Sequence, residues 1–266
     1  MEITIYVLIF LMGLMFGSFF SLAIYRIPLG KNITHERSFC PSCNHKLGFF
    51  DMIPLLSYIF LRGKCRYCSK KIGLRYILLE LASGLIFLLF AISLNINFLI
   101  IEQKKLVYLI IGILYFSGIM LIAGIDKEKR IISKQVLVYG MIVLFTYILY
   151  LYILEKINVY RYAIYLVLMC LLIMLNIMLL KKKVKENYTI NILLLCVYIA
   201  LFSQEEIFIY TILFTLVFVL LKSLICELKS KKNQNSNENK VLPIGLYLCS
   251  VNILLTIIQN FIIYRS

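Results

Sequence analysis

Charged residues are scarce in this 266-residue chain, and tryptophan is absent. Asp, Glu, Lys and Arg together make up 15% of the residues, whereas hydrophobic residues make up 62% and the mean hydropathy is +0.93. A soluble domain of this composition would aggregate, so we exclude an ordinary soluble protein and predict a polytopic helical membrane protein. Without tryptophan, the 19 tyrosines must supply the aromatic side chains at the membrane interfaces.

Acidic residues are scarcer than basic ones. Thirteen Asp and Glu stand against 28 Lys and Arg, which gives a formal net charge of +15. In a soluble protein this excess would point to nucleic acid, but in a membrane protein basic loops set the topology and lie near anionic lipid. We therefore expect membrane lipid, and no nucleic acid, as a partner of the basic segments.

Eight hydrophobic stretches are candidates for membrane-spanning helices, so the predicted fold class is an all-α membrane bundle. Crossing about 30 Å of hydrocarbon takes about 20 apolar residues. The sixth stretch is short for this length. The stretches cover residues 4–25, 77–94, 106–125, 135–154, 160–180, 189–203, 207–226 and 242–264.

Loops rich in basic residues alternate along the chain with loops that have few. Ten basic residues lie between Arg26 and Arg75, and the loops at 181–185 and 222–240 are also basic, whereas the loop SQEE at 203–206 has none. Because basic loops stay in the cytoplasm, the alternation predicts eight spans with both termini outside and the loop after the first span in the cytoplasm. It also favours keeping the short sixth span.

Two further segments bear on the organisation of the chain. Glu2 precedes the first stretch and Arg26 and Lys31 follow it, the reverse of a secretory signal, so we expect this stretch to remain as a membrane anchor. The stretch KSKKNQNSNENK at 229–240 lacks apolar residues and is predicted to be a polar cytoplasmic linker. No internal repeat is evident.

Four of the eight cysteines form a C-x₂-C-x₂₁-C-x₂-C array, at Cys40, Cys43, Cys65 and Cys68. Two such pairs can supply the four thiolates of a tetrahedral zinc site, and a cytoplasmic loop disfavours disulfides. Four cysteines close the coordination shell, so the predicted zinc is structural. Its binding would fold a loop that has little apolar surface of its own into a small cap. His35 and His45 are read as ordinary loop residues.

Aspartate occurs only twice, as Asp51 and Asp126. Asp126 follows the third stretch, in AGIDKEKRIISK, and a carboxylate at a membrane boundary is a candidate functional group. A solvated loop carboxylate beside Lys127 and Lys129 is the alternative. Glu80, just inside the second stretch, is expected to pair with Arg75 or to lie among polar groups at the cytoplasmic face.

At four places the chain resembles the type IV prepilin peptidases, which are polytopic membrane aspartic peptidases of bacteria. GLMFGSFFSLAIYRIP at 13–28 is similar to the opening segment of that family. The segment from Cys40 to Glu80 resembles its C-P-x-C-x-H, D-x-I-P, S-x-x-x-L-x-G-x-C-x-x-C and R-Y-x-x-x-E signature, which is highly specific. AGIDKEKRIIS at 123–133 resembles the segment of the first catalytic aspartate, and VLPIGLYLCS at 241–250 the C-terminal P-x-G segment.

This resemblance implies a first transmembrane helix (1–28), a cytoplasmic Cys₄ zinc loop (29–76) and a seven-helix aspartic-peptidase-like domain (77–266) in the bacterial inner membrane. The family cleaves the basic leader of type IV pilin-like precursors at the cytoplasmic membrane face, and many members then methylate the new N-terminus with S-adenosylmethionine. One aspartate activates water, and the other, protonated, polarises the scissile carbonyl. Asp126 would be the first of these two aspartates.

The second aspartate of the family, in G-x-G-D-x-K-L, has no counterpart at its expected place. Aligning the apolar run of KENYTINILLLCVYIALF at 185–202 puts Thr189 where the aspartate should be and Asn191 where the lysine should be. Glu186, three residues before Thr189, is a candidate substitute carboxylate. After Asp126, the usual Ile-Pro reads Ile132-Ser133.

Three interpretations follow, and the sequence leaves all of them open. The chain is an active peptidase that uses Glu186, or it has lost cleavage and keeps leader binding or methyl transfer, or it is a non-enzymatic partner in pilus assembly. A transporter is an alternative from a different functional class. It would need charged residues in the middle of spans and broken helices in two halves, and neither is found in the predicted spans.

Overall fold

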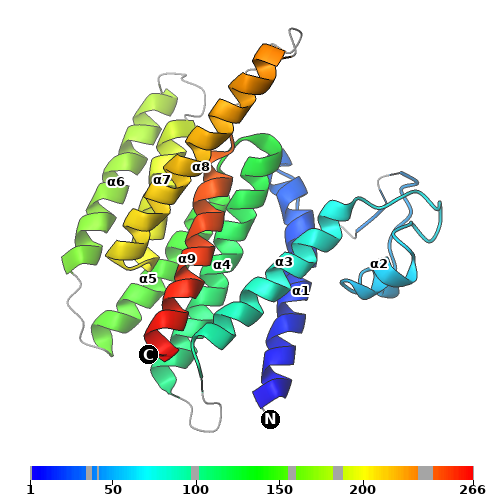
Figure 1. Cartoon of the computed structure of the whole chain (residues 1–266), viewed down its shortest axis with the longest axis horizontal. Coiled ribbons are helices and arrows are strands. Elements are labelled where there is room, and N and C mark those ends of the chain that lie inside the picture. Colours follow the sequence, from blue (N-terminus) through cyan, green and yellow to red (C-terminus); the bar gives the residue numbers. More distant parts are fainter. Residues whose placement is uncertain are drawn as a thin grey trace. The chain divides into compact units, whose positions relative to one another are not determined.

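The computed structural model describes residues 2–33, 38–40, 42–96, 102–154, 160–181, 188–232 and 242–265. Most of these residues are helical and none forms a strand, apart from two isolated bridges, which confirms the predicted all-α class. The helices are α1 (Glu2–Arg26), η1 (Ile27–Leu29), η2 (Phe49–Asp51), α2 (Leu56–Phe60), α3 (Leu74–Ser93), α4 (Gln103–Lys129), α5 (Lys134–Ile153), α6 (Tyr160–Lys181), α7 (Tyr188–Phe202), α8 (Glu205–Lys232) and α9 (Ile244–Arg265) (Figure 1).

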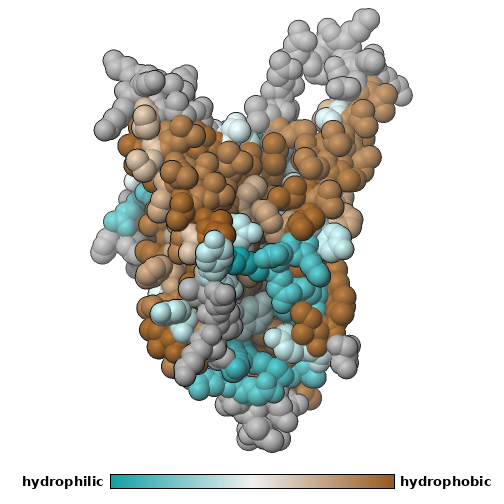
Figure 2. All heavy atoms as spheres, turned by 90° about the vertical axis from the view of Figure 1, so that its left-hand side faces the viewer, coloured by the Kyte–Doolittle hydropathy of each residue, from teal (hydrophilic) through white to brown (hydrophobic). Residues whose placement is uncertain are grey.

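Each of the eight predicted stretches corresponds to one helix. Seven helices in the described ranges are long and apolar enough to cross a membrane, and α7, with 15 residues, is shorter. At 1.5 Å per residue α7 extends about 22 Å, less than the hydrocarbon thickness. Most of its side chains are buried, as expected for a helix that is apolar all round. Helices α6 and α8, in contrast, expose many large apolar side chains, and Figure 2 shows a broad apolar surface.

Two predicted boundaries are wrong. Helix α4 continues to Lys129, so Asp126 lies within a helix and is fully buried, which rules out the solvated loop carboxylate. Helix α8 continues to Lys232, so the first four residues of the predicted linker 229–240 are helical. The polar composition of these four residues is compatible with a helix end that projects into water. The rest of the linker lies outside the described residues.

The chain divides into two compact units, residues 1–113 with 260–266 and residues 114–259. In the first unit, α1 and α3 lie side by side (Figure 1). A Cβ on Gly13 would lie 2.7 Å from the Gly84 Cα, and one on Gly17 would lie 2.6 Å from the Glu80 Cα. The Ser83 hydroxyl also donates to the Gly13 carbonyl at 2.7 Å. Small residues therefore let the two backbones approach closely, as in many membrane helix pairs.

In the second unit, α7 packs against α5, α6 and α8. Arg161 of α6 donates to the carbonyls of Ala200 and Ser203 at the C-terminal end of α7, which satisfies carbonyls that the helix leaves unpaired. A buried network follows from there: Asn252 donates to the Ser203 hydroxyl at 2.9 Å and accepts from Tyr115 at 2.8 Å. These polar contacts hold α7 in place against its neighbours.

Candidate functional site

The four loop cysteines of the first unit come together. Their sulfur atoms all lie within 4.8 Å of one another, and Cys40 and Cys65 are buried whereas Cys43 and Cys68 are exposed. Four thiolates about 2.3 Å from a tetrahedral zinc ion would be about 3.8 Å apart, and the Cys40 and Cys68 sulfurs are 3.9 Å apart. The donor set and its spacing therefore fit zinc, as predicted.

The two cysteine pairs share a backbone hydrogen bond, a residue with positive φ and a closing bridge. In the first, the N–H of Asn44 donates to the Cys40 carbonyl at 2.8 Å, and in the second, the N–H of Ser69 donates to the Cys65 carbonyl at 2.9 Å. Asn44 and Ser69 both have φ of 57°, and each pair closes with an antiparallel bridge, Phe39 to Lys46 and Lys64 to Lys71. The sequence analysis missed this short repeat, although CPSCNHK and CRYCSKK share their spacing.

The backbone also prepares the sulfur of Cys40 for a metal ion. The pKa of Cys40 falls to about 6, chiefly because the backbone N–H of Ser42 donates to its sulfur, while burial acts in the opposite direction. Donation from backbone N–H groups favours the thiolate, which is the form that binds metal. The turn geometry of the first pair thus supplies a thiolate near neutral pH.

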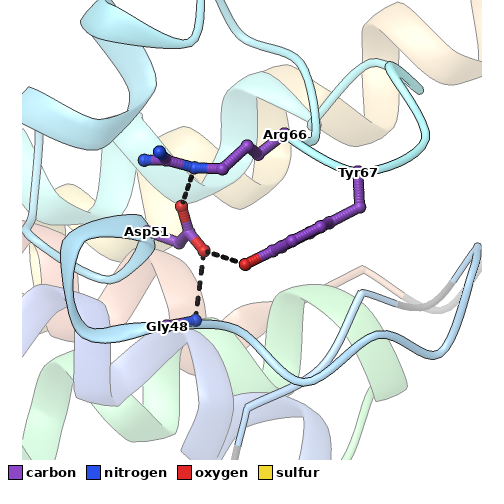
Figure 3. A network of polar contacts seen from close by, with 4 residues as sticks. All are labelled: Gly48, Asp51, Arg66 and Tyr67. Carbon is purple, nitrogen blue, oxygen red and sulfur yellow. Dashed lines mark hydrogen bonds and ion pairs between the residues drawn. The ribbon is translucent and has the colours of Figure 1, made fainter.

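Asp51 connects the segment between the two cysteine pairs to the second pair (Figure 3). Its carboxylate accepts from the Gly48 N–H at 3.1 Å, from the Arg66 Nε at 2.6 Å and from the Tyr67 hydroxyl at 3.3 Å. Burial raises the pKa of Asp51, but the Gly48 N–H, Arg66 and Tyr67 together lower it below its ordinary value. The His45 ring stacks on Tyr67 with centroids 3.6 Å apart, in keeping with its reading as a loop residue. His35 lies outside the described residues.

Glu80 attaches the cap that carries the four cysteines to the helices of the same unit. Its carboxylate accepts from the Leu55 N–H at 2.9 Å and from the Ser18 side chain of α1. Leu55 has φ of 62° and ψ of −54°, and the Leu56 N–H donates to the Pro54 carbonyl across it, so it is the centre of a γ-turn of the rare, strained kind. Glu80 therefore holds a strained turn of the cap against α1 and α3, which corresponds to the predicted setting among polar groups.

Asp126 of the second unit lies where α4, α7 and α9 meet. One carboxylate oxygen accepts from the Tyr188 hydroxyl at 2.8 Å, and the other accepts from the Leu246 N–H at 3.0 Å. The Tyr188 hydroxyl in turn accepts from the Ile244 N–H at 3.1 Å. The first N–H groups of a helix have no partner within it, so Asp126 and Tyr188 complete the N-terminus of α9.

Gly245, which has no side chain, allows the Asp126 carboxylate to lie close to the backbone at the start of α9. A Cβ on Gly245 would lie 3.1 Å from the Asp126 carboxylate, which is tighter than most such contacts. Arg130, one turn after Asp126, interacts with it electrostatically and donates its backbone N–H to the Asp126 carbonyl at 3.0 Å. The P-x-G segment is thus placed at the aspartate, although the two segments are far apart in the chain.

The structure places the residues that were predicted beside Asp126 in different environments. Thr189 is exposed, and its neighbour Tyr188 makes the contact with the aspartate. Asn191 is buried, accepts from Asn176 at 3.0 Å and faces the carbonyl of Ile132 at 3.5 Å. Glu186 lies outside the described residues. Within the described part of the chain, no second carboxylate is among the partners of Asp126.

Tyr188 was missed because the alignment followed the apolar run alone. Successive residues of a helix point about 100° apart, so a shift of one position changes which side chain meets α4. A tyrosine at the polar start of a buried helix was the signal available, because its hydroxyl needs a partner when it is buried.

Comparison with known proteins gives matches to part of the chain. Residues 11–94 match the family described as the Bacterial Peptidase A24 N-terminal domain. The chain is 37% identical over 130 residues to the "Prepilin leader peptidase/N-methyltransferase" of Klebsiella pneumoniae, which covers 47% of this chain and 53% of that protein. A protein of the same name from Myxococcus xanthus is 35% identical over 136 residues, which are 51% of this chain and 38% of that protein. Another from Vibrio cholerae is 43% identical over 90 residues, which are 31% of this chain and 36% of that protein.

These relatives are therefore covered only in part. The chain spans about half of the Klebsiella protein and about a third of the length of the other two. No solved structure matches. The domain match and the similar proteins support the family named from the sequence motifs, the type IV prepilin peptidases.

Proposed function

We propose that this chain, whose residues 11–94 match the N-terminal domain of the bacterial A24 peptidases, cleaves the leader of type IV pilin-like precursors. Cleavage would take place at the cytoplasmic face of the bacterial inner membrane, with the zinc cap on that side. The observation that supports it most is the setting of Asp126, whose two carboxylate oxygens are held by donors from α7 and α9. A carboxylate held in this way at the end of a span is a functional group by default.

In this proposal Asp126 acts as the base and Tyr188 as the proton donor. Peptide hydrolysis needs one group to take a proton from water and another to polarise the scissile carbonyl. A phenol holds its proton more tightly than a carboxyl group does, so the carboxylate is assigned the base and the phenol the proton donor. Glu186 is the alternative second group, as the sequence analysis proposed.

The proposal also covers the four cysteines of the cap and a second activity, methyl transfer. Cys40, Cys43, Cys65 and Cys68 would hold zinc, which would stabilise the folded cap and, with its four ligands, take no part in cleavage. The relatives are named N-methyltransferases as well as peptidases, so we extend the proposal to methylation of the new N-terminus with S-adenosylmethionine.

A second candidate function is leader binding, methyl transfer or pilus assembly without cleavage. It is favoured by the identity of the group that meets Asp126, which is a phenol and not a carboxylate. The full burial of Asp126 points the same way, because a substrate carbonyl and a water molecule must reach it for cleavage.

Co-expression with a pilin-like precursor from the same genome separates the two candidates. Leader removal would be scored by mass spectrometry for the wild type, Asp126→Asn, Tyr188→Phe and Glu186→Gln, with Thr189→Val as the matched control. Cleavage by the wild type and the control, and its loss in Asp126→Asn, would support the peptidase, and the other two variants would identify the second group. Intact precursor with the wild type, together with cleavage by Tyr188→Asp or Thr189→Asp, would establish the non-cleaving candidate.

A further inference from the structure

The short helix α2 of the zinc cap has an apolar face that no part of the described chain covers. Leu56, Ile59 and Phe60 are spaced at i, i+3 and i+4, so they share one side of the helix. They are 51%, 59% and 80% exposed, respectively. Exposure of this extent at three neighbouring apolar positions is unusual outside a membrane-spanning helix.

Two phenylalanines extend this face. Phe49 and Phe50 of η2 are 75% and 71% exposed, and their rings meet edge to face with centroids 5.8 Å apart. Helix η2 packs against α2. We call these five residues the aromatic face; they are Phe49, Phe50, Leu56, Ile59 and Phe60. They lie in the cap between α1 and α3, so the hydrocarbon that surrounds the spans does not account for them.

The cap that carries the aromatic face has a strongly positive charge. The one acidic residue of the described cap, Asp51, is only 5% exposed in its side chain and is paired with Arg66. Seven further basic residues of the cap segment, residues 29–76, are exposed: Lys31, Lys46, Arg62, Lys64, Lys70, Lys71 and Arg75. A basic leader peptide or a second copy of this cap would therefore be repelled, whereas a negatively charged surface would be attracted.

The cap is also held at a membrane surface from both ends. The chain enters it from α1, which ends at Arg26, and leaves it into α3, which begins at Leu74, and both helices are candidate spans. Exposed aromatic and aliphatic side chains flanked by basic residues are the features of protein surfaces that bind at lipid headgroups. We propose that the aromatic face of the zinc cap inserts into the interface of the adjacent leaflet and that its basic residues select anionic lipid.

This inference does not depend on the proposed function, and the absence of tryptophan from the chain makes it directly testable. Phe50→Trp and Phe60→Trp each place a single indole on the aromatic face, at positions exposed enough to leave the fold unchanged. The full chain would be reconstituted in nanodiscs of phosphatidylcholine with brominated acyl chains, with or without phosphatidylglycerol. Phe214→Trp, at a 48% exposed position of α8, is the control for an indole in contact with lipid in both nanodiscs.

With phosphatidylglycerol present, we expect both cap indoles to be quenched by the bromine atoms, to emit at shorter wavelength and to resist quenching by acrylamide. Adding Arg62→Gln and Lys71→Gln should lower the equilibrium constant for the inserted cap roughly 30-fold, at about tenfold per 1.4 kcal/mol and about 1 kcal/mol per basic residue. The control indole should not respond to these two substitutions.

Three results would overturn the inference. If acrylamide quenches the cap indoles in both nanodiscs, the aromatic face stays in water. If neither acrylamide nor bromine quenches them, protein covers the face. If bromine quenches them equally with and without phosphatidylglycerol, the basic residues do not select anionic lipid.

Discussion

Replacing Tyr188 by phenylalanine tests the junction around Asp126 directly. The substitution removes one hydroxyl and leaves the ring, so two hydrogen bonds are lost: the 2.8 Å bond to Asp126 and the 3.1 Å bond from the Ile244 N–H. A hydrogen bond to a charged group contributes about 1.5–3 kcal/mol, and a buried N–H left without a partner costs about 1–3 kcal/mol. Because such terms are not fully additive, we expect a loss of about 3 kcal/mol in the free energy of unfolding.

Thermal unfolding in detergent, followed by circular dichroism, measures this loss. Thr189→Val is the matched control, since it removes a hydroxyl from the neighbouring exposed residue and should change the stability by less than about 0.5 kcal/mol. The double variant with Asp126→Asn completes a cycle, in which we expect a coupling between the two side chains of about 1–3 kcal/mol. A Tyr188→Phe variant as stable as Thr189→Val, or a coupling near zero, would refute the assignment of Tyr188 as the partner of Asp126.

Three further predictions concern the first unit. Gly17→Val should destabilise the α1–α3 pair by about 1–3 kcal/mol in detergent unfolding, because its Cβ would lie 2.6 Å from the Glu80 Cα. Cys65→Ser should lower the zinc content of the purified chain, measured by elemental analysis, from about one ion to near zero, since a structural site needs all four ligands. Asp51→Asn should destabilise the cap at neutral pH but not in acid. The folded-state pKa of Asp51 is lowered, so its contribution is present above the ordinary value and is lost as the pH falls through the folded-state pKa.

Each of these three has a control and a contrary outcome. Gly73→Ala should be tolerated, because the nearest atom to its Cβ would be 3.8 Å away, and equal effects at both glycines would contradict close helix packing. Cys170→Ser, at an exposed position of α6, should keep its zinc. For Asp51, unfolding of the wild type and the variant would be compared along a pH series. A difference in stability that persists unchanged in acid would contradict a stabilising role of the ionised Asp51 carboxylate.

Local patterns account for the parts of the architecture that could be predicted. Composition and long apolar runs indicate membrane helices, since each helix must satisfy its backbone within itself. The cluster of four cysteines could be predicted for a similar reason, because two closely spaced cysteines in each pair place two sulfur atoms in one turn. The helix ends were less predictable: α4 continues past Asp126 although its last residues are charged.

The sequence by itself determined that this protein is a helical membrane protein with a four-cysteine cap and a single aspartate, Asp126, at the end of a span. Tertiary structure alone decided which side chain meets that aspartate. Tyr188 and Leu246 are 62 and 120 residues away from it along the chain, and a helix can present either of two neighbouring side chains after a rotation of about 100°. That rotation is set by packing against α5, α6 and α8, which no local pattern encodes. The same holds for the aromatic face of the cap, because the fold of the loop brings η2 and α2 together.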